Sequence, residues 1–111
     1  MESAVIAVVL AMVYTSGMRL TILYRDRSEH ARAVYEFVEM LRRRYPDKKP
    51  ELLDIDTRDG ASMAILHGVI EYPAIVVTSY DGHVMQQWEG LPLPLIDEVA
   101  AMMLEHQGAA V

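Results

Sequence analysis

Short apolar runs alternate with helix-like segments along most of this chain, and this alternation limits the fold more than any other feature of the sequence. Extended runs rich in β-branched and aliphatic residues, bounded by turn residues, are predicted at 19–24, 52–56, 74–78 and 83–88. Helices are predicted between and after them, at 28–45, 59–67 and 94–106. The order β-α-β-α-β-β-α predicts one α/β domain, with a mixed four-stranded sheet and helices on both faces.

The first predicted helix has an apolar side and a charged side. We expect Ser28 to cap its start, because a serine hydroxyl can accept a backbone N–H of the first turn, and Pro46 to end it. Arg42 to Arg44 stand near its end, where the helix dipole favours cations. The apolar residues recur at the period of a helix with one buried side: they are Ala31, Val34, Phe37, Val38, Leu41 and Tyr45.

Turn residues define where the later elements stop. Gly68 is predicted to end the second helix, and the Asp81-Gly82 pair between two extended runs predicts a hairpin. Asp54 and Asp56 are predicted to point to one side of a strand near its end. Trp88, close to the end of the last strand, is predicted to pack over the sheet.

Residues 3–14 form a nearly unbroken apolar run before the predicted domain. The run is too short to span a bilayer as a helix, for which about 20 residues are needed. It also lacks the basic start and the cleavage site of a secretory signal, so we expect a cytoplasmic protein. Residues 1–17 are predicted to be an apolar N-terminal extension that forms an extra strand, a homo-oligomer contact or an appendage; residues 18–111 are predicted to be the domain.

The chain contains no cysteine, which excludes thiol chemistry and thiolate metal sites within it. Its formal charge of −6 argues against nucleic acid as a partner. The charge is unevenly distributed, with nine basic and five acidic residues between positions 19 and 49, and one basic and ten acidic residues from position 50 onward. The two parts either attract each other within the monomer or form a charged docking surface.

Three short motifs follow one another in the second half of the chain. They are Gly68-Val69-Ile70-Glu71-Tyr72-Pro73, then Gly82-His83-Val84, then Trp88-Glu89-Gly90 with Pro92. Their spacing is similar to the Gly-Val-x-x-apolar-Pro, Gly-x-Val and aromatic-x-Gly pattern of thioredoxin-like proteins. With the element order, residues 18–106 resemble the glutaredoxin-sized version of that fold.

The resemblance implies a cis peptide bond between Tyr72 and Pro73 that faces the family's active site. It also places Ser28-Glu29-His30-Ala31 where the family has Cys-x-x-Cys, so no disulfide exchange is expected. A serine hydroxyl is too weakly acidic to replace an ionised thiol. The residues expected to remain as a binding site are Arg25, Arg27, Ser28, His30, Tyr72, Pro73, Gly90 and Leu91.

The residues point to binding rather than to catalysis. Ser28 and His30 stand two positions apart, so they do not face each other on a helix, and no catalytic residue is predicted. The histidines (His30, His67, His83 and His106) lack the spacing of metal ligands, so neither a metal nor another cofactor is predicted.

We therefore predict a redox-inactive thioredoxin-like binding or assembly module that recognises a peptide or protein partner near Ser28 and Pro73. A small anion or glutathione is a second candidate ligand. One alternative is an enzyme, either a thiol-independent one of glutathione-transferase or glutaredoxin type, or an oxidoreductase-related domain that relies on a partner's cysteine. Another is a structural protein that oligomerises through residues 3–14.

Overall fold

A computed structural model of the chain describes the backbone of residues 18–109 and the side chains of residues 18–103. The predicted N-terminal extension, residues 1–17, lies outside the described residues. The elements confirm the predicted order: β1 (Met18–Tyr24), α2 (Ala31–Arg44), β2 (Glu51–Asp54), α3 (Arg58–Leu66), β3 (Ala74–Ser79), β4 (Val84–Glu89) and α4 (Ile96–Ala109).

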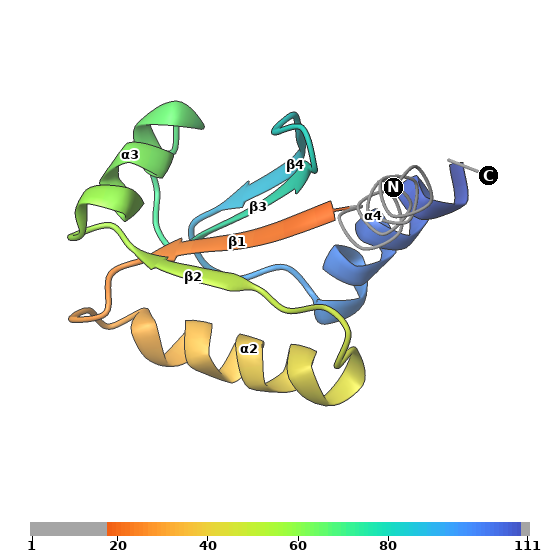
Figure 1. The fold of residues 1–111 in the computed structure, drawn as a ribbon. Coiled ribbons are helices and arrows are strands. Elements are labelled where there is room, and N and C mark those ends of the chain that lie inside the picture. Colours follow the sequence, from red (N-terminus) through yellow and green to blue (C-terminus); the bar gives the residue numbers. More distant parts are fainter. Residues whose placement is uncertain (1–17, 110–111) are drawn as a thin grey trace, which may run out of the picture.

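The strands form the predicted mixed four-stranded sheet, in the order β2-β1-β3-β4 (Figure 1). β1 runs parallel to β2 and antiparallel to β3, and β4 runs antiparallel to β3. The β3–β4 pair is the hairpin predicted from Asp81 and Gly82. The two inner strands, β1 and β3, are the most buried ones. Their apolar side chains can pack on both faces, because helices cover both faces of the sheet.

Helices cover both faces of the sheet, as predicted, with α2 and α3 on opposite sides (Figure 1). Side chains of one strand alternate between the faces. Ile22 and Ile75 belong to the core cluster that includes α2 and α4 residues, whereas Leu23 and Val76 belong to the cluster with Ala64 of α3. Trp88 is half-buried against the α2–α4 cluster, which confirms its predicted role in covering the sheet.

The buried side of α2 matches the predicted apolar stripe, with Val34 and Leu41 fully buried. On the exposed side, Arg32 pairs with Glu36 and Arg43 with Glu39, each at the i,i+4 spacing. Two of the nine basic residues between positions 19 and 49 are therefore paired with acidic residues of the same helix.

The prediction that Ser28 caps this helix is wrong. The residue at the cap position is His30, and no side chain bonds to the helix start there. The Ser28 hydroxyl instead donates a hydrogen bond to the carbonyl of Arg25. This bond holds the hydroxyl within the β1–α2 loop, two residues before the residue at the cap position.

β2 is shorter than predicted and stops at Asp54. The Asp54 carboxylate accepts the backbone N–H of Asp56, and its carbonyl accepts the N–H of Thr57. Asp54 and Asp56 therefore do not share one strand, because this local turn competes with the sheet. Thr57 then caps α3 by accepting the N–H of Gly60.

At the other end of the domain, α4 begins at Ile96, two residues later than predicted. In the part of the chain that the structure describes, none of the helices combines the length and the apolar character needed to cross a membrane.

Candidate functional site

One end of the sheet collects the loops that carry the predicted site residues. Leu23 of β1 lies opposite Ala74 of β3, so the chain leaves β1 towards Arg25 where it enters β3 from Pro73. Ala74 in turn lies opposite Glu89, the last residue of β4. Antiparallel and parallel pairing thus place the ends of β1, β2 and β4 and the start of β3 together.

Arg25, Ser28 and His30 form one hydrogen-bonded loop between β1 and α2. The backbone N–H of Arg25 donates to Nε2 of His30 at 2.9 Å, and the Ser28 hydroxyl donates to the Arg25 carbonyl. Since Nε2 accepts this bond, the neutral His30 ring carries its proton on Nδ1. Partial burial, and then the nearby Arg25 charge, lower the pKa of His30 below its ordinary value.

Acidic side chains accompany this loop on both sides. Nε of Arg25 lies 3.3 Å from Oδ1 of Asp56, which follows β2. The hydroxyl of Tyr35 on α2 donates to the Asp26 carboxylate and lies 3.3 Å from the hydroxyl of Tyr24. Hydrogen bonding to Asp26 is the largest cause that raises the pKa of Tyr35. Asp56 and Tyr35 were not predicted as site residues, because each meets the loop from a different element.

Arg27 is exposed, and no ion pair engages it among the described residues. Arg25 by contrast already has an acidic partner. The two arginines predicted to act together are therefore in different electrostatic situations.

Tyr72 and Pro73 lead into β3 through a cis peptide bond. Pro73 is fully buried, whereas Tyr72 is half-buried and packs against the α3-side cluster. Within the described residues, no hydrogen bond engages the backbone N–H or C=O of Tyr72. Main-chain groups at the start of a buried strand are thus unpaired within this part of the chain.

Glu89 joins the loop before β3 to the end of β4. Its carboxylate accepts the backbone N–H groups of Ile70 at 2.7 Å and of Glu71 at 3.1 Å. These bonds are the main cause that lowers the pKa of Glu89. The backbone N–H of Gly90 donates to the Pro73 carbonyl at 2.9 Å, and Leu91 beyond it is exposed.

The predicted residues thus fall into two groups at the same end of the sheet. The β1–α2 loop holds Arg25, Arg27, Ser28 and His30, and the loops around β3 and β4 hold Tyr72, Pro73, Gly90 and Leu91. Among the described residues, no hydrogen bond or ion pair joins the first group to the second. The pairing of the strands alone brings the two groups to one end of the molecule.

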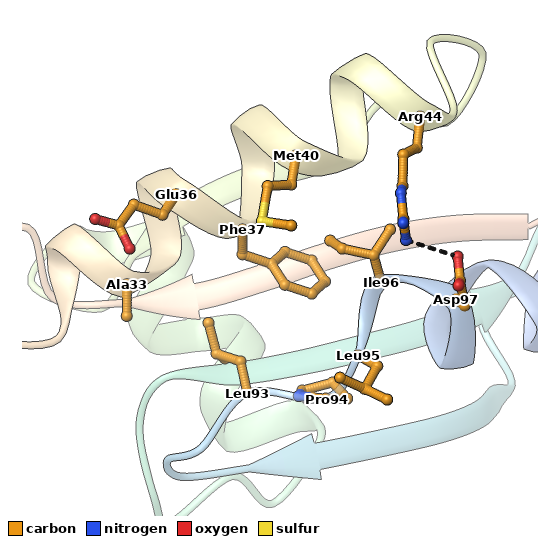
Figure 2. A pocket seen from close by; sticks show the side chains of 10 residues that line it. All are labelled: Ala33, Glu36, Phe37, Met40, Arg44, Leu93, Pro94, Leu95, Ile96 and Asp97. Atoms are coloured by element: carbon orange, nitrogen blue, oxygen red, sulfur yellow. Dashed lines mark hydrogen bonds and ion pairs between the residues drawn. The ribbon is translucent and has the colours of Figure 1, made fainter.

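An apolar groove of about 320 Å³ lies elsewhere, between α2 and the segment before α4 (Figure 2). Phe37 and Met40 face Leu93 and Leu95 across it, and Nη1 of Arg44 contacts Oδ1 of Asp97 at 3.2 Å at one end. None of the predicted site residues lines this groove. Pro94 and Leu95 were predicted to belong to the last helix, so the groove was not predicted from the sequence.

Among the described residues, no three histidine or acidic side chains come together in an arrangement that could hold a metal ion. Asp81 contacts both Ser79 and Nδ1 of His83 in the exposed hairpin turn. The carboxylate lies between the serine and the histidine there, so the histidine does not reach the serine as a base would.

No protein-family model matches the sequence, and no curated protein matches it either. Solved structures of thioredoxins are similar to it in fold. Fasciola hepatica thioredoxin is 16% identical, with 89% of this chain and 90% of that chain covered and a TM-score of 0.63. A mutant thioredoxin from Halobacterium salinarum is 21% identical, with coverages of 87% and 81% and a TM-score of 0.64.

Thioredoxin O2 of Arabidopsis thaliana in its oxidised state is 16% identical, with 92% of this chain and 86% of that chain covered and a TM-score of 0.61. At such identities the likeness establishes the fold and not the activity. The sequence contains no cysteine. The chain therefore has a thioredoxin-like fold that lacks the Cys-x-x-Cys motif.

Proposed function

We propose that this chain is a redox-inactive binding or assembly module that recognises an extended segment of a partner protein beside Tyr72 and Pro73. The observation that carries the proposal is the unpaired backbone of Tyr72. It lies between the buried Pro73 and the Ile70–Glu71 segment, whose backbone N–H groups bond to Glu89. An extended peptide can add to such a backbone as a short strand, with main-chain hydrogen bonds providing affinity.

The surroundings of Tyr72 favour a peptide over a small anion. Arg25 already pairs with Asp56, and its backbone N–H is taken up by His30. Leu91 presents an exposed aliphatic side chain on the neighbouring loop, which suits a peptide side chain and offers nothing to phosphate. Redox inactivity is supported by the lack of cysteine in the sequence.

The proposal is tested by selecting peptides from a random displayed library on the full chain and mapping a selected peptide by amide chemical shifts. We expect the shifts to centre on Tyr72, Ala74 and Gly90, and the fluorescence of Trp88 to change on titration. Methylating alternate backbone nitrogens of the peptide should weaken binding about tenfold or more, because it removes main-chain donors.

Failure to enrich any peptide over an unrelated control protein would contradict the proposal. So would binding that maps to the groove around Met40 and Leu95 instead. Inorganic phosphate and glutathione, titrated separately, test the anion alternative: shifts confined to the amides of residues 28–31 would support it against a peptide site.

A further inference from the structure

Two large aliphatic side chains are exposed in two neighbouring loops, one before Pro73 and one after β4. Ile70 is 82% exposed and Leu91 is 59% exposed. They belong to different loops, which Glu89 holds together through its bonds to the backbone of Ile70 and Glu71. Their spacing is therefore determined by the fold rather than by a flexible loop, which lowers the entropy lost on binding a partner.

Carboxylates accompany these aliphatic side chains. Glu71 lies over Gly90, since its Oε2 is 2.7 Å from the position that a Cβ there would take. Glu89 lies beside Glu71, because its carboxylate accepts the backbone N–H of Glu71. Neither Glu71 nor Glu89 forms an ion pair among the described residues. Glu89 already accepts the backbone N–H groups of Ile70 and Glu71 and the side-chain amide of Gln87, whereas no hydrogen bond or ion pair engages the Glu71 carboxylate among the described residues. The surface is thus both apolar and negatively charged.

Two further aliphatic side chains are exposed at the end of α3. Ile65 and Leu66 are 82% and 71% exposed there, and the carbonyl of Ile65 accepts the N–H of Gly68, two residues before Ile70. Ile70 and Leu91 together expose roughly 250 Å², well below the roughly 800 Å² per partner of a standard protein interface. An area of this size suits a short segment rather than a second folded domain.

From this juxtaposition we infer that the surface formed by Ile70, Glu71, Glu89 and Leu91 selects peptide segments that combine aliphatic side chains with lysine or arginine. The inference rests on the proposed function and adds the class of segment that the site takes. In an extended peptide, successive side chains point to opposite sides, so aliphatic residues at alternate positions contact Ile70 and Leu91. A basic side chain two positions from an aliphatic one points to the same side and meets the Glu71 carboxylate.

The experiment compares three matched sets of short extended peptides on the full chain by fluorescence anisotropy. All three carry two valines and one test residue at alternate positions, so that these side chains point to the same side. The test residue is lysine, glutamine or glutamate, and the intervening positions are serine in all three. We expect the lysine peptides to bind about tenfold more tightly than the glutamine ones and the glutamate peptides to bind least. The lysine advantage should shrink when salt is raised, because the carboxylates are exposed.

Variants locate the effect. Glu71→Gln should reduce the lysine advantage about threefold or more, and Ile70→Ser should weaken all peptides, while both leave the urea unfolding midpoint close to that of the parent because both side chains are exposed. Val84→Ser is the control, since Val84 is an exposed aliphatic residue at the opposite end of β4. It should change neither affinity nor preference.

The possible outcomes distinguish this inference from the proposed function. Peptides that bind at Tyr72 with equal affinity for lysine, glutamine and glutamate versions would overturn this inference and leave the proposed function standing. If neither these peptides nor library peptides bind, the proposed function falls and the inference falls with it. If the preference for lysine persists in Glu71→Gln but disappears when an acidic residue of α2 is replaced, the selectivity lies elsewhere and the inference is also overturned.

Discussion

Gly60 of α3 packs directly against the carbonyl group of Asp54, at the end of β2. A Cβ on Gly60 would overlap the Asp54 carbonyl oxygen, because the distance between them would be far shorter than two such atoms allow. The glycine is buried, and its backbone N–H donates a hydrogen bond to the hydroxyl oxygen of Thr57, the residue that caps α3. Its role is therefore to let α3 approach the sheet, at the side where the candidate site begins.

Replacing this glycine with alanine should destabilise the domain. In an exposed helix the change would stabilise by up to about 1 kcal/mol, because alanine favours the helix. Here the steric conflict with backbone atoms dominates, and we expect Gly60→Ala to lower the free energy of unfolding by about 3 kcal/mol. Urea unfolding measures the change. Ser62→Ala, an exposed position on the same helix, is the control and should change stability by less than about 0.5 kcal/mol.

Glu89 should titrate at an unusually low pH. Its backbone hydrogen bonds from Ile70 and Glu71 lower the pKa of the carboxyl group in the folded state. The stability that they contribute is therefore present above the ordinary glutamate pKa and is lost as the pH falls through the lower, folded pKa. A carboxyl carbon titration by NMR should show the lowered pKa, and Glu89→Ala should cost about 1 kcal/mol at neutral pH.

Glu29→Ala is the matched control for Glu89. Glu29 is also exposed, and no hydrogen bond or ion pair engages its side chain among the described residues. Its removal should leave the unfolding free energy nearly unchanged. Equal effects of the two variants would show that the carboxylate of Glu89 does not join the two loops in solution.

His30 should titrate below its ordinary pKa, because partial burial and the charge of Arg25 both lower the pKa in the folded state. Protonation also removes the acceptor for the Arg25 N–H. The neutral ring thus stabilises the loop fully above about pH 6.5, and this contribution is lost as the pH falls through the lowered pKa.

Histidine ring shifts and the amide shift of Arg25, followed between about pH 4 and 8, measure this transition. Arg25→Ala should raise the pKa of His30 part of the way back, since the backbone donor remains and only the charge is removed. Independent titration of the Arg25 amide and the His30 ring would contradict the hydrogen bond.

Asp97 should control the ionisation of Tyr45. Its Oδ1 accepts a hydrogen bond from the Tyr45 hydroxyl at 3.0 Å, and this bond is the largest cause that raises the pKa of Tyr45. The bond contributes stability below about pH 10 and is lost as the pH rises through the raised pKa. Asp97→Ala should bring the tyrosine pKa back towards its ordinary value, as measured by ultraviolet absorbance; Glu98→Ala, the neighbouring acid, should not.

Local sequence patterns were enough to predict the element order and the buried side of α2. These features depend on periodicity: a spacing of three and four residues defines one face of a helix, and short β-branched runs define strands. Val34 and Leu41 are buried, and Arg32 pairs with Glu36, because neighbours on a helix surface follow directly from their separation in sequence.

The same patterns did not predict the strand ends or the helix caps. Ser28 is a favourable capping residue, yet its hydroxyl bonds to Arg25, and β2 stops where Asp54 forms a turn with Asp56. Serine and aspartate side chains bond readily to nearby backbone groups in several ways. Which of these forms depends on how the neighbouring loops pack.

The arrangement of the candidate site arises from the packing of the complete sheet. Arg25 meets Asp56 across 31 positions, and Glu89 reaches Ile70 across 19, and no periodicity links residues so far apart. The register of β1, β3 and β4 brings them to one end of the sheet. That register follows from burying both faces of the inner strands at once, a condition that the whole chain satisfies and no single segment contains.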